Sequence, residues 1–324
     1  MQEVGRWNRL GVARRLRRPP AYFAGVLAAA LAVFLLAACG GDAGDGDGLS
    51  GTIIGDGSST AFPISEAVAE EFRKVQPRVD VVVGISGTGG GFSKFCNGET
   101  DFNNASRPIK AEEQEVCAAN GIEAVEFQIA FDGLSVVVNP ENDFVDCLTV
   151  EELKRIWEPG SEVDNWNDVR AEWPDESIEL YGPDTDSGTF DYFTSEIVGE
   201  EDASRPDYAA SADDNVLVQG IAGDDEALGY FGFAYYTENM DKLKLVAIDG
   251  GSGCVLPSRE TIESGEYSPL SRPLLLYVRQ DALERPEVVE LVRFYLTEGR
   301  ALVAEVGYVE APEDIYQEGL AKLP

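Results

Sequence analysis

The sequence predicts an α/β fold of two lobes, and three observations support that expectation. The chain has 324 residues, enough for two domains that each bury a core. Its composition, 44% hydrophobic and 10% aromatic, is that of a globular protein. From residue 52 onward, short β-branched segments alternate with helical patterns, which is typical of a sheet covered by helices.

The first set of alternating elements covers residues 52–140. TIIG (52–55) predicts a strand, and PISEAVAEEFRKV (63–75) predicts an amphipathic helix with Pro63 in its first turn. A helix at 111–121 is expected to end at Gly121. The remaining expected elements are strands at 79–86, 101–106, 124–131 and 133–140, and a short helix at 90–98.

A second set starts near VEELKRIW (150–157). It includes IELYGP (178–183), a helix at 189–199, GYFGFAYYTEN (229–239), a fully apolar strand at 271–278, and closing helices around 284–299 and 312–322. The boundary between lobes is expected to run through two apolar connecting strands. The predicted organisation is lobe 1 at 50–132 plus 279–324, connecting strands at 133–138 and 272–278, and lobe 2 at 139–271.

The charge of the chain is strongly negative. Lys and Arg total 25 against 59 Asp and Glu, a formal net charge of −34, and the chain has no histidine. Such a field repels nucleic acid and anionic lipid, which argues against both as partners. Solubility, in a salty medium for example, explains the excess of acids. Any bound anion must therefore be held by local geometry.

The first 39 residues resemble an export signal. Arg14, Arg15, Arg17 and Arg18 precede an apolar run that ends at Cys39. The residues LAAC resemble the lipobox of bacterial lipoproteins, in which the cysteine carries lipid after residues 1–38 are removed. A retained transmembrane helix is the alternative. The glycine-rich polar segment that follows predicts a flexible tether, so 39–49 would tie an exported protein to the outer face of the cell membrane.

Export makes disulfides the expected state of the other four cysteines. No CxxC motif and no histidine is available for zinc, so a metal site is not expected. Three pairings are open. We favour Cys96–Cys117, which closes a short local loop, with Cys147–Cys254, because both then lie within single predicted lobes.

Four strand-to-helix turns carry similar chemistry. They combine glycines, hydroxyls or an arginine at the carboxyl ends of predicted strands, where open α/β sheets bind ligands. Helix N-termini there present free N–H groups to anions, and Arg107 would add a planar guanidinium. Each turn alone has a structural explanation, since Ser58–Thr60, Ser187 and Thr189 could simply cap helices. The turns are GDGSSTAFP (55–63), GISGTGGGF (84–92), ASRPI (105–109) and DTDSGTF (184–190).

Ordered motifs over nearly all of 50–324 resemble the phosphate-binding proteins of Pst-type ABC transporters. That family has a two-lobed periplasmic-binding-protein (type II) fold, in which two α/β domains are joined by two crossover strands and close on one phosphate. The motifs are GSSTAFPISEAVAEEF (57–72), GTGGGFSKFCNGETDFNNASRPI (87–109), YGPDTDSGTFDYF (181–193), DDNVLVQGI (213–221), LGYFGFAYY (228–236) and PLSRPLLLYV (269–278).

The resemblance implies which residues hold phosphate. The family's three binding turns fall on Ser59, Thr60 and the Phe62 amide, on Ser86 and Gly87, and on Ser187, Gly188 and Thr189. Some members carry an arginine shortly before the S-G-T turn, where this chain has Pro183-Asp184-Thr185, so Arg107 must supply the guanidinium. The best-known branch has an aspartate at the position of Arg107.

A carboxylate that accepts the O–H of HPO₄²⁻ would reject sulfate, which cannot donate. Asp186 is our candidate for that role, and a helix-capping acid or an ion-pair partner of Arg107 is the alternative.

The resemblance implies a lipid-anchored, monomeric solute-binding protein without cofactors. Its partners would be inorganic phosphate, a permease pair and a cytoplasmic ATPase. An enzyme is the main alternative class, but a Ser-His-Asp relay is excluded in a chain without histidine. A lipoprotein of the same fold that binds sulfate or molybdate, or acts as a sensor or adhesin, is a further alternative.

Overall fold

A ten-stranded mixed sheet runs through the part of the chain that the computed structural model describes, residues 48–185 and 187–324. The predicted signal segment, Cys39, most of the tether and the candidate carboxylate Asp186 lie outside the described residues. Eight strands follow the order β2-β1-β3-β12-β4-β8-β6-β7, and β13 and β9 pair with β4. Three further strands form a small separate sheet in the order β11-β10-β5.

The strands confirm the alternation expected from the sequence. Their bounds are β1 Gly51–Gly57, β2 Val79–Val83, β3 Phe102–Ala105, β4 Ala124–Val138, β5 Cys147–Thr149, β6 Glu179–Pro183, β7 Ala209–Ser211, β8 Ala227–Gly232, β9 Lys244–Leu245, β10 Ala247–Asp249, β11 Cys254–Val255, β12 Ser271–Arg279 and β13 Val309–Glu310.

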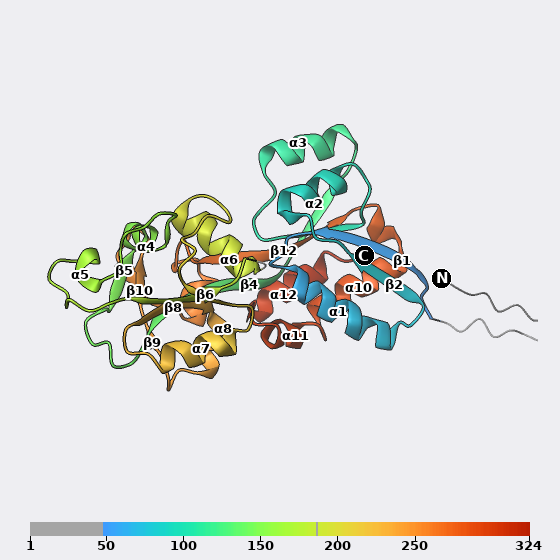
Figure 1. Cartoon of the computed structure of the whole chain (residues 1–324). Coiled ribbons are helices and arrows are strands. Elements are labelled where there is room, and N and C mark those ends of the chain that lie inside the picture. The colour runs from blue at the N-terminus through green and yellow to red at the C-terminus, as the bar shows by residue number, and fades with distance from the viewer. Residues whose placement is uncertain (1–47, 186) are drawn as a thin grey trace, which may run out of the picture. The chain divides into compact units, whose positions relative to one another are not determined.

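The helices cover both faces of this sheet (Figure 1). Their bounds are α1 Phe62–Val75, α2 Gly87–Cys96, α3 Ala111–Ala119, α4 Val150–Trp157, α5 Trp166–Val169, α6 Gly188–Phe193, α7 Asp214–Ala222, α8 Phe233–Glu238, α9 Arg259–Glu263, α10 Pro286–Leu296, α11 Arg300–Glu305 and α12 Glu313–Ala321.

Several expectations about element boundaries were wrong. The helix expected to begin at residue 90 begins at Gly87, and the strand expected at 79–86 ends at Val83. The separate strands predicted at 124–131 and 133–140 are one strand, β4, which continues through Asp132 and Gly133. Its first part pairs with β12 and its last part, Leu134–Val138, pairs with β8. The helix predicted at 189–199 is α6 followed by a π-helical turn at Thr194–Val198, and it ends at Gly199 in the left-handed conformation.

Separate apolar clusters form on the two faces of the sheet. Leu275 of β12 packs with Phe92 and Phe95 of α2, whereas Leu276 packs with Phe72 of α1 and with residues of α10. Successive side chains of a strand point to opposite faces, so the apolar run of β12 serves both clusters. This explains why the segment Leu274–Val278 has no alternation of polar and apolar residues.

Both favoured disulfide pairings are confirmed. Cys96 on α2 is bonded to Cys117 on α3, with a sequence separation of 21. Cys147 on β5 is bonded to Cys254 on β11, with a separation of 107.

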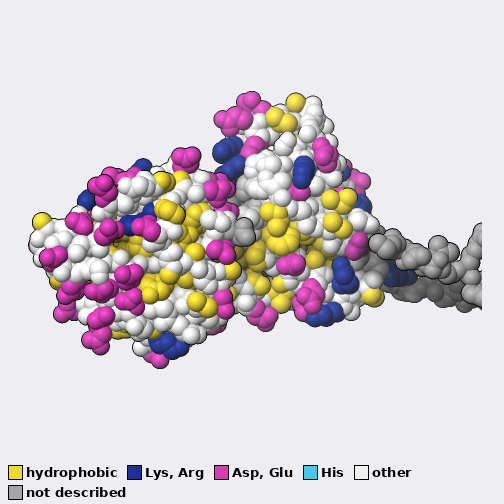
Figure 2. All heavy atoms as spheres, in the orientation of Figure 1, with side chains coloured by type: hydrophobic (Ala, Val, Ile, Leu, Met, Phe, Trp, Pro, Cys, Tyr) yellow, Lys and Arg dark blue, Asp and Glu magenta, His cyan; other side chains and the backbone are white. Residues whose placement is uncertain are grey.

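Acidic side chains are spread across the visible face of the molecule, and Lys and Arg are interspersed among them (Figure 2). Within the described residues, no helix has both the length and the apolar character needed to cross a bilayer.

Candidate functional site

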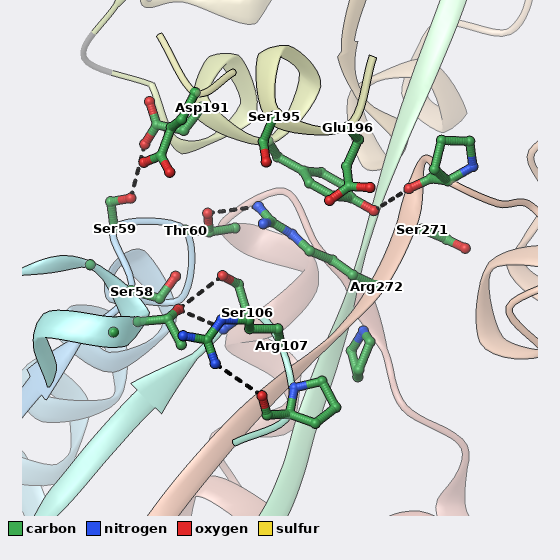
Figure 3. A pocket seen from close by; sticks show the side chains of 18 of the residues that line it. Ser58, Ser59, Thr60, Ser106, Arg107, Asp191, Ser195, Glu196, Ser271 and Arg272 are labelled. Carbon is green, nitrogen blue, oxygen red and sulfur yellow. Dashed lines mark hydrogen bonds between the residues drawn. The ribbon is translucent and has the colours of Figure 1, made fainter. Parts of the chain in front are cut away.

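A polar cavity of about 620 Å³ lies where several of the predicted turns converge (Figure 3). One wall comes from the turn after β1, the start of α2 and the segment after β3. The opposite wall comes from α6, the π-helical turn after it, and the chain that leads into β12. The lining is dominated by hydroxyl and charged side chains, which suits a polar ligand.

Five of the residues predicted to bind phosphate line this cavity. They are Ser59, Thr60, Ser86, Gly87 and Arg107. These residues belong to three different strand-to-helix connections, so the folding of the sheet brings them together as expected for the carboxyl ends of its strands.

The predicted S-G-T turn lines a neighbouring cavity instead. Phe62, Ser187, Gly188 and Thr189 surround a space of about 380 Å³, and Ser59 lines both cavities. The two groups of predicted residues are therefore adjacent but do not share a single pocket in this structure.

The turn after β1 owes its conformation to a glycine. Gly57 has φ +135°, in the region that favours glycine, and a Cβ there would lie 2.1 Å from the backbone oxygen of Asn104. The chain can therefore bend sharply at the end of β1. Ser58 then donates its amide to that same oxygen at 3.0 Å, and this fixes the hydroxyl-rich turn beside β3.

Several of the predicted hydroxyls already have partners within the protein, Ser187 and Ser86 among them. Ser187 caps α6 by accepting the Thr189 amide at 3.2 Å, as the structural alternative proposed. Ser86 donates its hydroxyl to Asp56, which also accepts from Lys94 at 2.6 Å. Burial opposes ionisation of Asp56, but its hydrogen bonds to Lys94 and Ser86 outweigh burial and lower its pKa.

Arg107 is held by a carboxylate of the following helix. Its Nη1 and Nη2 donate to the two carboxylate oxygens of Glu113 at 2.9 and 2.8 Å, a bidentate pair. Burial acts to raise the pKa of Glu113, but the Arg107 bond and the Lys110 amide prevail, so the pKa lies below its usual value. The guanidinium reaches the cavity as predicted, with its fork directed at this partner.

A second arginine lines the cavity and was not predicted. Arg272, at the start of β12, donates from Nη2 to Thr60 Oγ1 at 2.8 Å (Figure 3). It also pairs with Asp132 of β4 at 3.1 Å. Burial raises the pKa of Asp132, and the charge of Arg272 acts in the opposite direction. The residue stands in the quoted PLSRPLLLYV segment, but its apolar context indicated only a strand.

Other polar lining residues were also missed by the sequence analysis. Several of them are next to predicted residues in the sequence, so the turn motifs already indicated their location. No motif in the sequence indicated that the acids of the opposite wall line the cavity. The missed residues are Ser58, Thr88, Ser106, Lys110, Asp191, Ser195, Glu196, Glu201, Ser268 and Ser271.

Direct contacts join the two walls. Ser59 donates its hydroxyl to Asp191 at 3.1 Å, and Thr60 Oγ1 lies 3.4 Å from the carbonyl oxygen of Gly188. Burial is the main cause that raises the pKa of Asp191 to about 6, and the charges of Asp202 and Glu201 add to it. The half-buried carboxylate therefore titrates just below neutrality.

The arrangement can bind an oxyanion. Hydroxyl donors and the guanidinium groups of Arg107 and Arg272 line one polar cavity, and Lys110 lies on the same wall as Arg107. Among the described residues, no cluster of three or more Asp, Glu, Cys or His side chains could hold a metal ion. Because these donors act at short range, the acidic surface does not prevent anion binding.

A sequence model of the PBP superfamily domain matches residues 44–298, and these include every residue that lines the 620 Å³ cavity. The chain belongs to the PBP superfamily. Its resemblance to the PstS-type phosphate-binding proteins is confirmed, and so is the two-lobed α/β fold that this resemblance implies. The family is one of solute-binding transport proteins.

Individual relatives agree with this assignment. The chain is 52% identical to protein SphX of Synechocystis over 83% of its own length and 81% of that protein. It is 42% identical to the phosphate-binding protein PstS of Staphylococcus saprophyticus, over 90% of this chain and 91% of that protein. The crystal structure of a possible phosphate binding protein from Planctomyces limnophilus is 53% identical and has a TM-score of 0.81, covering 84% of this chain and 98% of that one.

Proposed function

We propose that the protein captures inorganic phosphate in the 620 Å³ cavity and delivers it to an ABC importer. The observation that supports this most directly is the convergence of Ser59, Thr60, Ser86 and Arg107 on one cavity in a PstS-type chain. Hydroxyl and guanidinium donors suit a tetrahedral oxyanion. The protein acts in this proposal as a carrier and catalyses no reaction.

The proposal includes a movement of two lobes. Lobe 1 comprises 50–132 and 279–324, and lobe 2 comprises 139–271, connected through 133–138 and 272–278. The contacts of Ser59 with Asp191 and of Thr60 with Gly188 then cross between the lobes. Phosphate bound beside them would complete the closure and bring the S-G-T turn at 187–189 toward the anion. A closed monomer would dock on a permease pair that is driven by a cytoplasmic ATPase.

The location proposed is the outer face of the cell membrane. The residues LAAC before Gly40 would be processed so that Cys39 carries the lipid, and 39–49 would act as the tether. Both disulfides fit an oxidising compartment. Mass spectrometry of the protein from membranes tests this proposal, because a diacylated N-terminal Cys39 is expected and an intact N-terminus would contradict it.

Calorimetric titration of the purified protein with phosphate and with sulfate tests the function. We expect tight phosphate binding, weak sulfate binding and no turnover. Preference for sulfate or molybdate would assign the cavity to another oxyanion, and no binding of any of them would favour a sensor or adhesin role.

Arg107 supplies a specific test of the site. Arg107→Ala should remove most of the phosphate affinity while the unfolding midpoint stays close to that of the wild type, because Glu113 remains partly exposed to water. Titration and thermal unfolding of the same sample measure both quantities. Unchanged phosphate affinity would exclude Arg107 from the site.

The source of discrimination against sulfate is proposed to be Asp186. Asp186→Asn should narrow the ratio of phosphate to sulfate affinity, because the amide no longer repels sulfate as a carboxylate does. Asp191→Asn is the matched comparison, since Asp191 is a carboxylate of the cavity wall. An unaltered ratio in Asp186→Asn would leave that residue a capping role.

A further inference from the structure

We propose that Arg272 is a second anion-binding guanidinium of the cavity and that Asp132 is the positioning residue that holds it. This inference rests on the proposed function and adds to it a binding residue that comes from the connecting strand β12.

Asp132 fixes the direction of the guanidinium. The two residues lie opposite each other in the antiparallel pairing of β4 and β12. Nε and Nη2 of Arg272 each lie 3.1 Å from the same carboxylate oxygen, Oδ2. The side chain of Asp132 is only 2% exposed, so water competes little with Arg272 for its carboxylate.

Two further contacts hold the guanidinium plane. Its central carbon lies 3.5 Å from the centre of the Tyr192 ring, within cation–π range. Nη2 donates to Thr60 Oγ1 at 2.8 Å. Nη1 donates to none of the residues that the structure describes, while the side chain keeps 16% of its surface exposed at the cavity. A donor is therefore preorganised and available.

The contact with Thr60 also prepares that hydroxyl for an anion. Because Oγ1 accepts a hydrogen bond from Arg272, its own hydrogen points elsewhere, and the Gly188 carbonyl at 3.4 Å is a weak acceptor for it. A ligand oxygen can take this hydrogen and the free Nη1 hydrogen together. Arg272 and Thr60 would then form one two-donor contact.

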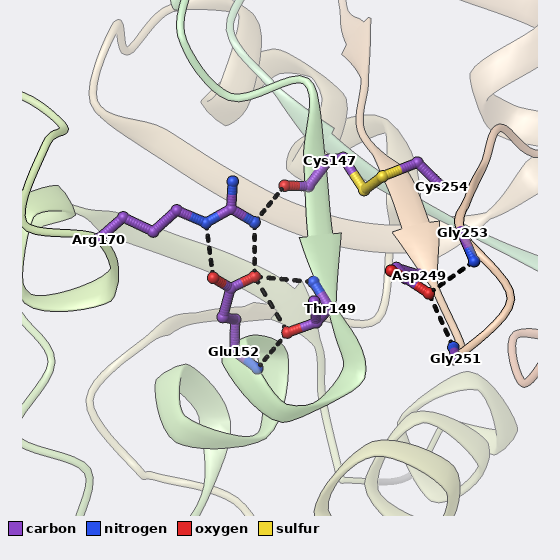
Figure 4. The surroundings of a disulfide bond; sticks show 8 residues. All are labelled: Cys147, Thr149, Glu152, Arg170, Asp249, Gly251, Gly253 and Cys254. Carbon is purple, nitrogen blue, oxygen red and sulfur yellow. Dashed lines mark hydrogen bonds and ion pairs between the residues drawn. A yellow bond between two sulfur atoms is a disulfide. The ribbon is translucent and has the colours of Figure 1, made fainter.

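Another arginine–carboxylate pair in the molecule has similar chemistry away from the two cavities described above. Arg170 donates to both carboxylate oxygens of Glu152 at 2.6 and 2.8 Å, and its central carbon lies 4.5 Å from the Trp173 ring (Figure 4). This pair lies beside the Cys147–Cys254 disulfide and lines neither of the two cavities described above. It provides a matched control for the structural part of the Arg272–Asp132 pair.

The test is a calorimetric titration with inorganic phosphate. The double variant Asp132→Asn/Arg272→Gln removes both charges together and so leaves neither one buried without a partner. We expect its phosphate affinity to fall about 10- to 100-fold, the range of a lost hydrogen bond to a charged group. The control Glu152→Gln/Arg170→Gln should bind within about twofold of the wild type, since a structural pair contributes no contact to the ligand.

The conservative variant Arg272→Lys keeps the charge but loses the fork, so its affinity should lie between those of the wild type and the double variant. Asp132 acts through Arg272, so the single changes Asp132→Asn and Arg272→Gln should affect phosphate affinity non-additively. A structural role would instead lower the unfolding midpoint without this coupling in affinity.

Several outcomes would overturn the proposal. If the double variant binds phosphate as the wild type does, Arg272 is not a ligand, although the phosphate-binding function stands. If the control variant loses phosphate affinity to the same extent, the loss reflects a general destabilisation of the fold, and Arg272 does not contact phosphate. If the wild type itself binds no phosphate, the proposed function and this inference fail together.

Discussion

Two arginines of the same cavity are each paired with a carboxylate, but the two pairs are built in different ways. Arg107 and Glu113 are six residues apart, and their side chains are 30% and 18% exposed. Arg272 and Asp132 are 140 residues apart, and their side chains are 16% and 2% exposed. The Arg107–Glu113 pair is local in sequence and partly exposed to solvent, whereas the Arg272–Asp132 pair is formed by two strands and is largely buried.

The difference shows in the carboxylates. Both carboxylates lose hydration through burial, which acts to raise a carboxylate pKa. At Glu113 the hydrogen bonds from Arg107 and Lys110 have the larger effect and lower its pKa, whereas at Asp132 burial has the larger effect and raises its pKa. A partly exposed pair contributes little to stability and can be broken at small cost. A buried pair must remain complete, because either member alone would be an uncompensated charge.

The largest expected effect comes from breaking the buried pair. Arg272→Gln leaves the Asp132 carboxylate without its ion partner and should lower the free energy of unfolding by about 3–5 kcal/mol at pH 7. Arg107→Gln is the matched change and should cost about 1 kcal/mol or less, because water reaches Glu113. Urea unfolding of both variants measures the difference, and equal losses would contradict the comparison.

Acidification sharpens the same experiment. The pKa of Asp132 is raised in the folded protein, and removal of Arg272, whose charge lowers it, should raise it further. A raised carboxylate pKa means that stability is greatest below the unfolded value and falls as pH rises. The loss of unfolding free energy in Arg272→Gln, relative to the wild type, should therefore become smaller between pH 7 and pH 4. A loss that does not change with pH would contradict burial of the Asp132 charge.

An intermediate effect is expected from two glycines, each beside one of the pairs. A Cβ on Gly188 would lie 2.8 Å from Oγ1 of Thr60, the acceptor of Arg272, and 3.0 Å or less from its backbone. A Cβ on Gly89 would lie 3.5 Å from Nη2 of Arg107, an ordinary contact.

Gly188→Ala should therefore lower the free energy of unfolding by about 1–3 kcal/mol through overpacking. Gly89→Ala, inside α2, should be neutral or stabilising, because alanine favours a helix over glycine. Thermal unfolding of both variants tests this expectation. A stable Gly188→Ala variant would show that the contact with Thr60 yields easily.

The smallest effect concerns the local pair and has the opposite pH dependence. The pKa of Glu113 is lowered in the folded protein, so its contribution is present above the unfolded value near 4.5 and is lost as pH falls through the folded value. Glu113→Gln should be slightly less stable than the wild type at pH 7, and this difference in stability should shrink as the pH falls below about 4.5. A deficit that grows on acidification would contradict this sign.

The local features of the fold could be predicted from the sequence. The turn residues after β1 and β3 and the short-range disulfide Cys96–Cys117 follow from short segments whose neighbours decide their conformation. Arg107 belongs with these features, since both it and its partner lie around the start of α3. Five of the predicted phosphate ligands accordingly reach one cavity.

The strand β4 shows where local sequence was insufficient. Asp132 interrupts an apolar run and was expected to separate two strands, the second of which would begin at Gly133. In the folded protein Arg272 compensates the charge of Asp132, and Gly133 pairs with Ser271, so the strand continues. The polar residue is tolerated inside the sheet only because its partner arrives from a distant part of the chain.

The sequence by itself determined the alternation of strands and helices and the oxyanion chemistry of the turns, because these depend on neighbouring residues and on composition. Only the tertiary structure decided that Arg272 and Asp132 meet, that Asp191 faces Ser59, and that the S-G-T turn lies in a neighbouring cavity. Those placements depend on which strands pair and which walls touch, and a contact over 140 residues has no signature in the segments that form it.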